Sequence, residues 1–317
     1  MSAEIGLIFH WGLYSVPAYD SVASVRRRKT QNGSEWYYAR LHADLQGYRP
    51  ISEAKETQQF HQENYPSLSY DDFRQMFLID PSTWDPQSWM DLAKEVNATY
   101  VILTAKHHDG YCLWPTQVEP DKQITDKIDI LATFANAAIN NNLKFGIYYS
   151  WWEFDRTITK DYLHNVLIPE IQELKQYSPD IWWFDGHWKL DSKIAIQTVS
   201  NIVNDLKQLN PQVEINDRIT KASLNTNELG LATYRVYEDR AIPEEEPLVP
   251  WEHINTLGLS WGFNYEQQTQ DYKTQKEITS LRDKVFSLNG RLLLNLGPDS
   301  NGNLDEKEVQ SLRYLVY

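Results

Sequence analysis

Six apolar segments of this sequence end in polar side chains that can act as acids, bases or hydrogen-bond partners. The segment DIWWFDG (180–186) is the clearest, because its run of large apolar residues stops at Asp185 and Gly186. The other segment ends carry His10; His107, His108 and Asp109; Tyr149; Asp217 and Arg218; and Glu238. A single Asp or His at a strand end is usually a turn former or a satisfied polar group. Six such ends together indicate one polar pocket.

A pair of carboxyl groups is the chemistry that fits this pattern best. A retaining glycosidase uses an ionised carboxylate as nucleophile and a protonated carboxyl group as proton donor, about 5–5.5 Å apart. Asp185 suits the nucleophile, because it ends a hydrophobic strand. The partner must come from another loop, and Glu238 and Glu252 are candidates. Neutral imidazoles and indole N–H groups in the same pocket can bond sugar hydroxyls.

Other chemistries fit the sequence less well. His10, His107 and His108 suggest a metal ion, but adjacent residues of a strand point to opposite faces, so His107 and His108 would not bind one ion together. The sequence contains no HExxH or HxH motif, no GxSxG nucleophile motif, and no glycine-rich phosphate loop after an early strand. We therefore expect neither a metal ion nor another cofactor.

The hydrophobic pattern predicts the elements that position these residues. Near-continuous apolar runs, typical of parallel strands covered on both faces, lie at 5–11, 100–108, 144–151, 180–186, 213–218 and 291–298. Weaker strands are expected near 233–237 and 256–260. Helical patterns lie between the strands, at about 126–142, 164–177, 191–209 and 272–289.

Eight strands that alternate with helices predict an α/β fold, a (β/α)8 TIM-like barrel. In such a barrel the carboxyl ends of the strands share one mouth, where active sites lie. No linker interrupts the sequence, so residues 1–317 are predicted to form a single catalytic domain. Its unusual part is a polar, aromatic-rich excursion at about 20–90, which we expect to form an elaborated loop with its own helices over the mouth.

Composition argues against several functions. The chain has 30 Lys and Arg against 44 Asp and Glu, a formal net charge of −14, so neither nucleic acid nor an anionic membrane is an expected partner. Cys112 is the one cysteine, so no internal disulfide can form. The apolar runs are too short to cross a bilayer, and the first residues do not resemble a signal peptide, which favours a cytoplasmic location. The 12 Trp and 19 Tyr often stand beside polar residues, an arrangement suited to sugar rings.

Seven motifs, in order along the chain, give the sequence a family likeness. They are FHWGLYS (9–15), EWYYARL (35–41), TAKHHDGYCLWP (104–115), WFDG (183–186), NDR (216–218), WEHINTLGLSWGFN (251–264) and LLLNLGPDSNGNL (292–304). Through these motifs the chain resembles the α-L-fucosidases of glycoside hydrolase family 29. It stops soon after the last motif, so the resemblance is to a short form, a catalytic domain without the C-terminal β-sandwich of longer members.

The resemblance implies a retaining exo-α-L-fucosidase that removes terminal α-L-fucose from fucosylated glycans or oligosaccharides by double displacement. It implies Asp185 as the nucleophile and Glu238, in YEDRAIP, as the acid/base residue, with Glu252 as the alternative. The implied substrate-binding residues are His10, Glu35, Trp36, His107, His108, Tyr149, Arg218 and Trp261. Of these, Trp36 and Trp261 can pack on the sugar ring and on its C5 methyl group.

Two alternatives of other kinds stay open at this point. One is a catalytically inactive fucose-binding protein on the same scaffold, which would require the loss of a carboxylate, and Asp185 is present. The other is a related glycosidase that acts on another sugar such as galactose. The expected partner is a fucosylated oligosaccharide or glycoconjugate. Without the sandwich, the leaving-group side of the pocket is open, or is built by residues 20–70 or by another subunit of a homo-oligomer.

Overall fold

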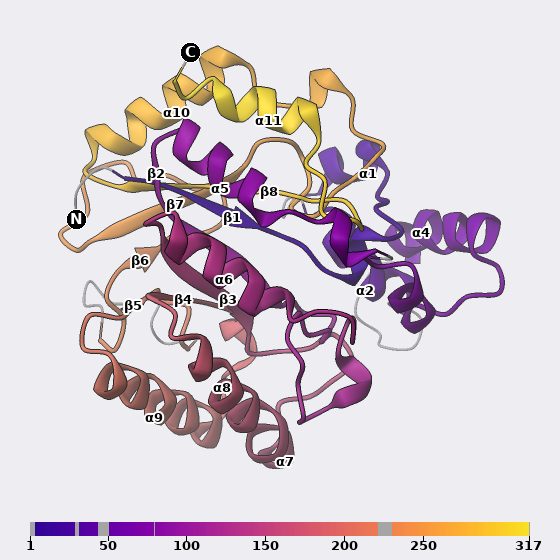
Figure 1. The fold of residues 1–317 in the computed structure, drawn as a ribbon, viewed down its shortest axis with the longest axis horizontal. Helices are drawn as coiled ribbons and strands as arrows, with labels where there is room; N and C mark the ends of the chain where they lie inside the picture. Colours follow the sequence, from indigo (N-terminus) through magenta and orange to yellow (C-terminus); the bar gives the residue numbers. More distant parts are fainter. Residues whose placement is uncertain (1–3, 29–31, 44–50, 79, 221–229, 317) are drawn as a thin grey trace.

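Eight parallel strands form the centre of the molecule (Figure 1). The structure is a computed structural model that describes residues 4–28, 32–43, 51–78, 80–220 and 230–316. The strands are β1 (Ile5–Phe9), β2 (Ala98–Lys106), β3 (Lys144–Ser150), β4 (Ile181–Asp185), β5 (Glu214–Ile215), β6 (Arg235–Val236), β7 (Trp251–Thr256) and β8 (Arg291–Leu296). Most strand residues are buried, because their side chains alternate between the barrel interior and the surrounding helices.

The sheet closes on itself. Its strand order is β5-β4-β3-β2-β1-β8-β7-β6, and the ladders between neighbours are parallel. The two edge strands, β5 and β6, meet through a parallel bridge between Asn216 and Tyr234. The backbone N–H of Thr233 also donates to the carbonyl of Ile215 at 2.8 Å. The prediction of a (β/α)8 TIM-like barrel is therefore confirmed.

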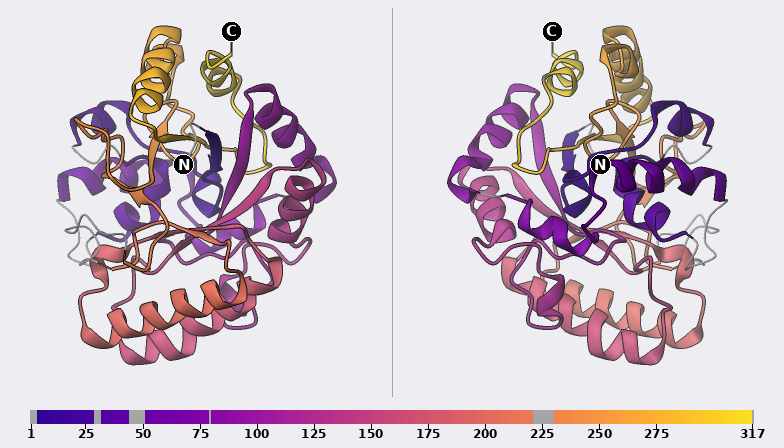
Figure 2. Two further views of the ribbon diagram at one scale, coloured as in Figure 1. Left: turned by 90° about the vertical axis from the view of Figure 1, so that its left-hand side faces the viewer. Right: turned by 90° about the vertical axis from the view of Figure 1, so that its right-hand side faces the viewer.

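Helices surround the strands, as the two side views in Figure 2 show. They are α1 (Val22–Arg27), α2 (Tyr37–Leu41), α4 (Ile51–Asn64), α5 (Pro86–Glu95), α6 (Ile130–Asn140), α7 (Lys160–Tyr162), α8 (Ile168–Leu174), α9 (Lys193–Leu209), α10 (Gln275–Ser287) and α11 (Glu306–Arg313). A short π-helical stretch, Leu163–Leu167, joins α7 to α8. Several helices begin at caps that the sequence displays, such as Asp129 before α6 and Ser192 before α9.

One predicted strand is misplaced. The pattern indicates a strand near 256–260, whereas β7 spans Trp251–Thr256. The sequence of β7, WEHINT, escapes the hydrophobic pattern because Glu252, His253 and Asn255 interrupt it. All three are nevertheless buried, and each has a polar partner. A strand whose buried polar side chains are hydrogen-bonded is therefore difficult to predict from hydrophobicity alone.

The predicted excursion lies between β1 and β2 and contains α1, α2, α4 and α5. Buried contacts attach it to the last loops of the barrel. Asp20 pairs with Arg28 and, at 3.0 Å, with Arg40, while the Asn264 side chain donates to the Asp20 carbonyl at 2.8 Å. Aromatic rings fill the space between its helices; they are Tyr37, Phe60, Tyr65, Tyr70 and Phe73. The excursion is thus packed onto the barrel, and the single domain over 1–317 stays a prediction.

Large side chains fill the barrel interior beneath the mouth. The ring of Tyr100 lies beside Gly6, where an added Cβ would stand 2.1 Å from the ring Cζ. The Arg291 guanidinium lies 4.9 Å from the centroid of the Tyr100 ring and 4.3 Å from that of Tyr234. It also pairs with Glu252 at 3.0 Å. This layer closes the barrel from beneath and leaves the open space at the carboxyl ends of the strands.

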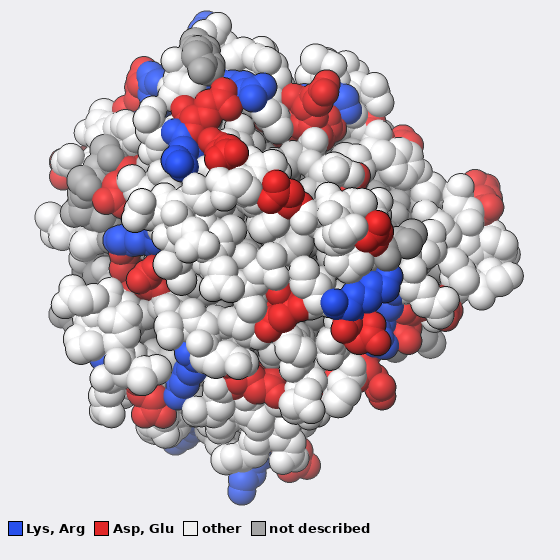
Figure 3. Space-filling view, viewed as in Figure 1, with Lys and Arg blue, Asp and Glu red and all other residues white. Residues whose placement is uncertain are grey.

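The surface carries charges of both signs. Acidic and basic side chains are interspersed over the face shown in Figure 3. Among the described helices, none is long and apolar enough to cross a membrane.

Candidate active site

A cavity of about 390 Å³ opens at the carboxyl ends of the strands. Its lining residues are His10, Asn32, Glu35, Trp36, His107, His108, Tyr148, Trp183, Asp185, Trp188, Arg218, Asp239, Ile254 and Trp261. They come from distant parts of the chain, because parallel strands of one barrel bring their ends to one mouth. The size and the mixed polar and aromatic lining are those of a small-molecule site.

Asp185, at the end of β4, is the acidic group at the centre of the cavity. Its Oδ2 accepts a hydrogen bond from the Tyr148 hydroxyl at 2.9 Å, and its Oδ1 accepts one from Arg218 at 3.0 Å. The His108 Nε2 lies 3.6 Å from Oδ2, and the His187 Nδ1 lies 4.0 Å from Oδ1. Burial alone would raise the pKa of Asp185, but the charge of Arg218 and the hydrogen bond from the Tyr148 hydroxyl hold that pKa below its ordinary value. The group is therefore a carboxylate, the form a nucleophile needs.

Gly186 allows the backbone to turn away directly after Asp185, the last residue of β4. Its φ is +77°, a left-handed conformation that side chains rarely adopt. A Cβ there would also lie 3.1 Å from Ser150 Oγ and 3.2 Å from Trp152 Cβ. The Asp-Gly sequence thus ends the strand at the residue whose side chain faces the cavity.

Three histidines line the cavity beside Asp185. His10 bonds Asn295 Oδ1 at 2.5 Å, and His108 bonds Ser150 Oγ at 2.6 Å. Burial lowers the pKa of His10 to about 4, and it also lowers the pKa of His107 and of His108. All three imidazoles are therefore neutral near pH 7. His107 Nδ1 is buried without a hydrogen-bond partner among the described residues.

The expectation that His107 and His108 point to opposite faces is wrong. Strand β2 ends at Lys106, so the two histidines lie in the turn that follows rather than in strand geometry. Their ring centroids are 4.3 Å apart, and both rings line the cavity. The turn is closed by a hydrogen bond from the Gly110 N–H to the His107 carbonyl at 3.1 Å.

Glu35 and Trp261 join the excursion to the loop after β7. Glu35 Oε1 accepts from the Gly33 N–H at 2.7 Å, and Oε2 accepts from the N–H groups of Trp261 and Gly262 at 3.3 and 3.2 Å. Burial raises the pKa of Glu35 against these hydrogen bonds. The Trp261 ring lies 5.3 Å from the His10 ring and beneath the Arg240 guanidinium, at 4.7 Å. The excursion therefore contributes directly to the cavity wall.

Tyr149 does not line the cavity, and its neighbour Tyr148 does. Side chains alternate along β3, so Tyr148 points into the barrel and Tyr149 points to the outer face. The Tyr149 hydroxyl donates to Glu170 Oε2 at 2.6 Å, and its ring lies 4.6 Å from Lys106 Nζ. The tyrosine assigned by resemblance is therefore one residue away from the tyrosine that contacts Asp185.

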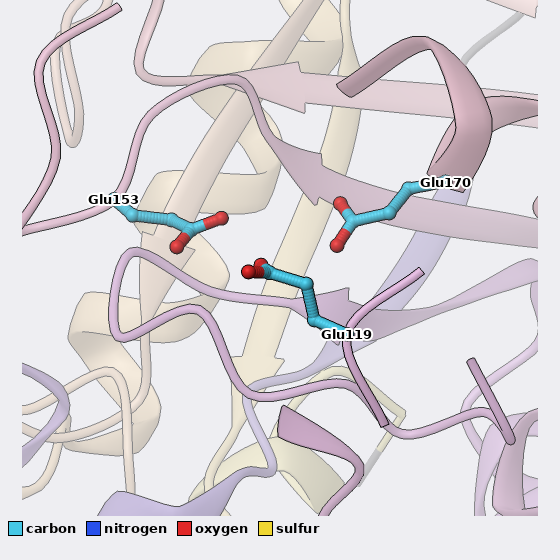
Figure 4. A group of neighbouring side chains, drawn as sticks. All are labelled: Glu119, Glu153 and Glu170. Carbon is cyan, nitrogen blue, oxygen red and sulfur yellow. The ribbon is translucent and has the colours of Figure 1, made fainter. Parts of the chain in front are cut away.

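Three glutamates behind the histidines point toward one another (Figure 4). Carboxylate oxygens of Glu119, Glu153 and Glu170 lie within 4.8 Å of one another. Cationic side chains offset part of their charge, since Lys106 Nζ lies 2.9 Å from Glu153 and 2.6 Å from Glu170. Arg156 makes two hydrogen bonds to Glu119, at 2.8 and 2.7 Å. This group is best described as a buried ion cluster that supports the ends of β2 and β3.

The two candidate proton donors from the sequence lie away from the cavity lining. Glu252 is fully buried inside the barrel, where it accepts from the Tyr100 hydroxyl at 2.7 Å and from the Trp183 indole at 2.8 Å. Glu238 is exposed in the turn after β6. The next residue, Asp239, lines the cavity and accepts from Arg218 at 2.5 Å. Arg218 thus bridges the carboxylates of Asp185 and Asp239.

Six residues that line the cavity were not among the predicted site residues: Asn32, Tyr148, Trp183, Trp188, Asp239 and Ile254. The two-residue alternation of β4 could have indicated Trp183, which lies on the same face as Asp185. The same rule could not have chosen between Tyr148 and Tyr149, because the register of β3 relative to the pocket is not visible in the sequence. No sequence signal distinguishes Asp239 from Glu238.

Comparison with known proteins places this geometry in a family. The family model for alpha-L-fucosidase matches residues 1–316.

The chain belongs to the alpha-L-fucosidase family.

Several alpha-L-fucosidases are similar to it along most of its length. Tissue alpha-L-fucosidase of Homo sapiens is 30% identical over 318 residues, covering 95% of this chain and 62% of the human protein. An alpha-L-fucosidase of Branchiostoma floridae is 30% identical over 326 residues, and the match covers 66% of that protein. The chain thus spans less than two thirds of the length of these curated fucosidases.

Solved structures give the same picture. The alpha-fucosidase of Thermotoga maritima is 26% identical and superimposes with a TM-score of 0.80 over 99% of this chain and 71% of that chain. A structure of the same enzyme in complex with fucose superimposes with a TM-score of 0.79.

Proposed function

We propose that this protein hydrolyses terminal α-L-fucosides with retention of configuration, acting on a fucosylated oligosaccharide or glycoconjugate. The observation that carries the proposal is Asp185, a carboxylate in a cavity lined by neutral imidazoles, in a chain of the alpha-L-fucosidase family. Fucose as the sugar is supported by the Thermotoga maritima enzyme, whose structure was solved in complex with fucose.

The cavity lining suits a monosaccharide with hydroxyl groups on its edge and an apolar patch. Neutral His10, His107 and His108 can donate or accept hydrogen bonds, and Glu35 offers an acceptor. The indole of Trp261 supplies a flat apolar surface for ring carbons and for the C5 methyl group of a 6-deoxy sugar. Each type of contact that fucose needs is therefore present on the wall.

The reaction proceeds in two steps in this proposal. A carboxylate oxygen of Asp185 attacks the anomeric carbon, and the bond from that carbon to the leaving oxygen breaks while the leaving oxygen takes a proton from an acidic group. A water molecule then gives a proton to the same group and attacks the anomeric carbon, which releases fucose and restores the Asp185 carboxylate. The two inversions produce net retention.

We propose Asp239 as the proton donor in place of the Glu238 that the sequence favours. Retention uses two carboxyl groups in one pocket, and Asp185 and Asp239 both bond the guanidinium of Arg218. Both residues are exposed, but Asp239 lines the cavity and Glu238 does not. The place of Glu252 inside the barrel, where Tyr100, Trp183 and Arg291 contact it, supports the choice of Asp239 over Glu252.

The nucleophile is tested with 4-nitrophenyl α-L-fucoside. The protein should release nitrophenol, and Asp185→Asn should lower kcat by at least about three orders of magnitude, because the covalent route is lost. Asp180→Asn is the matched control, since Asp180 precedes the amino end of β4, away from the mouth, and accepts from the Phe145 N–H at 3.0 Å. Azide added to Asp185→Gly should give the β-fucosyl azide. Full activity of Asp185→Asn would contradict the proposal.

The proton donor is tested by comparing leaving groups. Asp239→Ala should lose most activity on a fucosyl disaccharide and little on a dinitrophenyl fucoside, because a good leaving group needs no proton. Azide should then restore turnover and give the α-fucosyl azide, the product of retention. Glu238→Ala is the control at the neighbouring residue. If Glu238→Ala lost activity on the disaccharide and Asp239→Ala kept it, Glu238 would be the proton donor.

Sugar specificity is tested with matched substrates. The nitrophenyl α-L-fucoside and the corresponding α-D-galactoside differ in handedness and in the C6 hydroxyl, so their kcat/KM ratio separates a fucosidase from a galactosidase. Calorimetry with fucose separates an enzyme from a binding protein, since fucose binding without turnover of any fucoside would indicate an inactive scaffold.

A further inference from the structure

The outer wall of the cavity carries several aromatic side chains, of which only Trp36 was among the predicted substrate-binding residues. We call Trp36, Trp152, Phe154 and Trp188 the mouth cluster. Its members come from the excursion, from the loop after β3 and from the turn after β4, and they pack against one another. Two of them, Trp152 and Phe154, are buried, while Trp36 and Trp188 are partly exposed and line the cavity.

Trp188 is held at a fixed place relative to Asp185. The chain leaves β4 at Gly186 and forms a short 3-10 turn, His187–Lys189. Two backbone hydrogen bonds close this turn, from the Lys189 N–H to the Gly186 carbonyl at 3.2 Å and from the Leu190 N–H to the His187 carbonyl at 3.0 Å. Trp188 therefore stands three residues after Asp185 on a rigid support.

The indole of Trp188 has room for a ring against it. Its ring contacts are all steeply inclined: His108 at 5.6 Å and 73°, Trp152 at 6.3 Å and 65°, and His187 at 5.3 Å and 77°. No ring among the described residues is stacked on it. A partly exposed indole on a cavity wall without a stacked neighbour is a flat apolar surface that a ligand can cover.

We infer that Trp188 binds the sugar from which fucose is removed, by stacking its indole on the pyranose ring of that leaving sugar. The inference rests on the proposed function. When a terminal sugar occupies the histidine-lined floor, the rest of the glycan must leave through the mouth, where Trp188 lies. A pyranose has an apolar face of C–H groups that an indole can stack on.

The test is a ratio of two rates. α-L-fucosyl fluoride has no leaving sugar, so its kcat/KM reports on the floor of the cavity alone, whereas a fucosyl disaccharide also reports on the mouth. Trp188→Ala should lower the ratio of kcat/KM for the disaccharide to kcat/KM for the fluoride by at least tenfold, mainly through KM for the disaccharide. Trp188→Phe should recover part of the ratio, because a ring is restored.

Tyr265→Ala is the matched control, since Tyr265 is an aromatic residue that is 43% exposed and does not line the cavity. It should leave the ratio within twofold of the parent value. An unchanged ratio in Trp188→Ala, or equal losses on the two substrates, would overturn the inference and leave the proposed function standing. A parent protein that hydrolyses neither the fluoride nor the disaccharide would overturn both.

Discussion

Asp185 keeps its charge in surroundings that would otherwise neutralise it. Burial raises the pKa of a carboxyl group. The charged Arg218 and the Tyr148 hydroxyl both donate hydrogen bonds to Asp185, and together they lower its pKa below the ordinary value. The neighbouring histidines stay neutral because burial lowers their pKa. At the residue scale, the cavity therefore places the Asp185 carboxylate beside the charged Arg218 and beside neutral imidazoles that can form hydrogen bonds.

The first prediction concerns the acid limb of the pH profile. The pKa values of His10 and His187 are about 4, and that of Asp185 lies below its ordinary value, so these groups change charge only in strong acid. We expect kcat/KM on a nitrophenyl fucoside to hold from neutral pH to about pH 5 and to fall below about pH 4. Circular dichroism at each pH controls for unfolding. A fall centred between pH 6 and 7 would show that a histidine of ordinary pKa controls the site.

The second prediction separates Tyr148 from Tyr149. Tyr148→Phe removes a hydrogen bond to a carboxylate, worth about 1.5–3 kcal/mol, so the pKa of Asp185 should rise by about 1–2 units and the acid limb should move up with it. Tyr149→Phe is the matched change on the opposite face of β3, where the hydroxyl bonds Glu170 instead. Its pH profile should keep the parent shape. A shifted profile in Tyr149→Phe alone would contradict the placement of the two tyrosines.

At the scale of elements, the mouth depends on how α11 docks on β8. Glu308 of α11 is 4% exposed, and its Oε2 accepts from the N–H of Gly297, which directly follows β8, at 3.0 Å. Burial raises the pKa of Glu308 to about 8. The buried carboxyl group is therefore protonated at neutral pH, and its ionisation at higher pH opposes the docking of the helix.

The third prediction follows from that pKa. A carboxyl group whose pKa is raised on folding binds its proton more tightly in the folded state, so its favourable contribution is complete below the unfolded pKa of about 4.5 and is lost as pH rises through about 8. The loss amounts to about 1.4 kcal/mol per pKa unit. Glu308→Gln cannot ionise and should raise Tm over the parent at pH 9 far more than at pH 5. Glu306→Gln, at an exposed position of α11, should change Tm equally little at both values.

At the scale of the whole molecule, the barrel depends on polar residues buried in its interior. Arg291 and Glu252 pair at 3.0 Å between the rings of Tyr100 and Tyr234, and Glu252 also bonds the Trp183 indole that lines the cavity. The layer beneath the mouth is therefore held by charges that have been removed from water. Such pairs are sensitive to the loss of one partner.

The fourth prediction tests this layer. Arg291→Met should destabilise the protein by about 3–5 kcal/mol, because Glu252 would be left buried without its cation. The double variant Arg291→Met with Glu252→Gln should recover part of that loss, since residue 252 then carries no charge and Glu214, the other partner of Arg291, keeps Lys144. Urea unfolding followed by tryptophan fluorescence measures both free energies. Equal stability of the single variant and the parent would mean that water reaches Glu252.

The sequence was sufficient for the architecture and for much of the site. Near-continuous apolar runs predict buried parallel strands, and most of them form where the pattern indicates. The position of three site residues follows directly from this pattern: Asp185, His10 and Arg218. A residue at or just after the carboxyl end of a barrel strand lies at the mouth, whatever the conformation of the loops. The motifs KHHDG and SWGFN add the family, which the family model matches over residues 1–316.

Only the tertiary structure decided which side chain of a neighbouring pair faces the cavity. Tyr148 rather than Tyr149, and Asp239 rather than Glu238, line it, and His107 and His108 both enter it because β2 ends one residue before them. Residue types at adjacent positions are nearly equivalent in a sequence, whereas a shift of one residue moves a strand side chain to the opposite face. Glu252 is the clearest case, since a carboxyl group that suits a proton donor by its motif is paired with Arg291 inside the barrel.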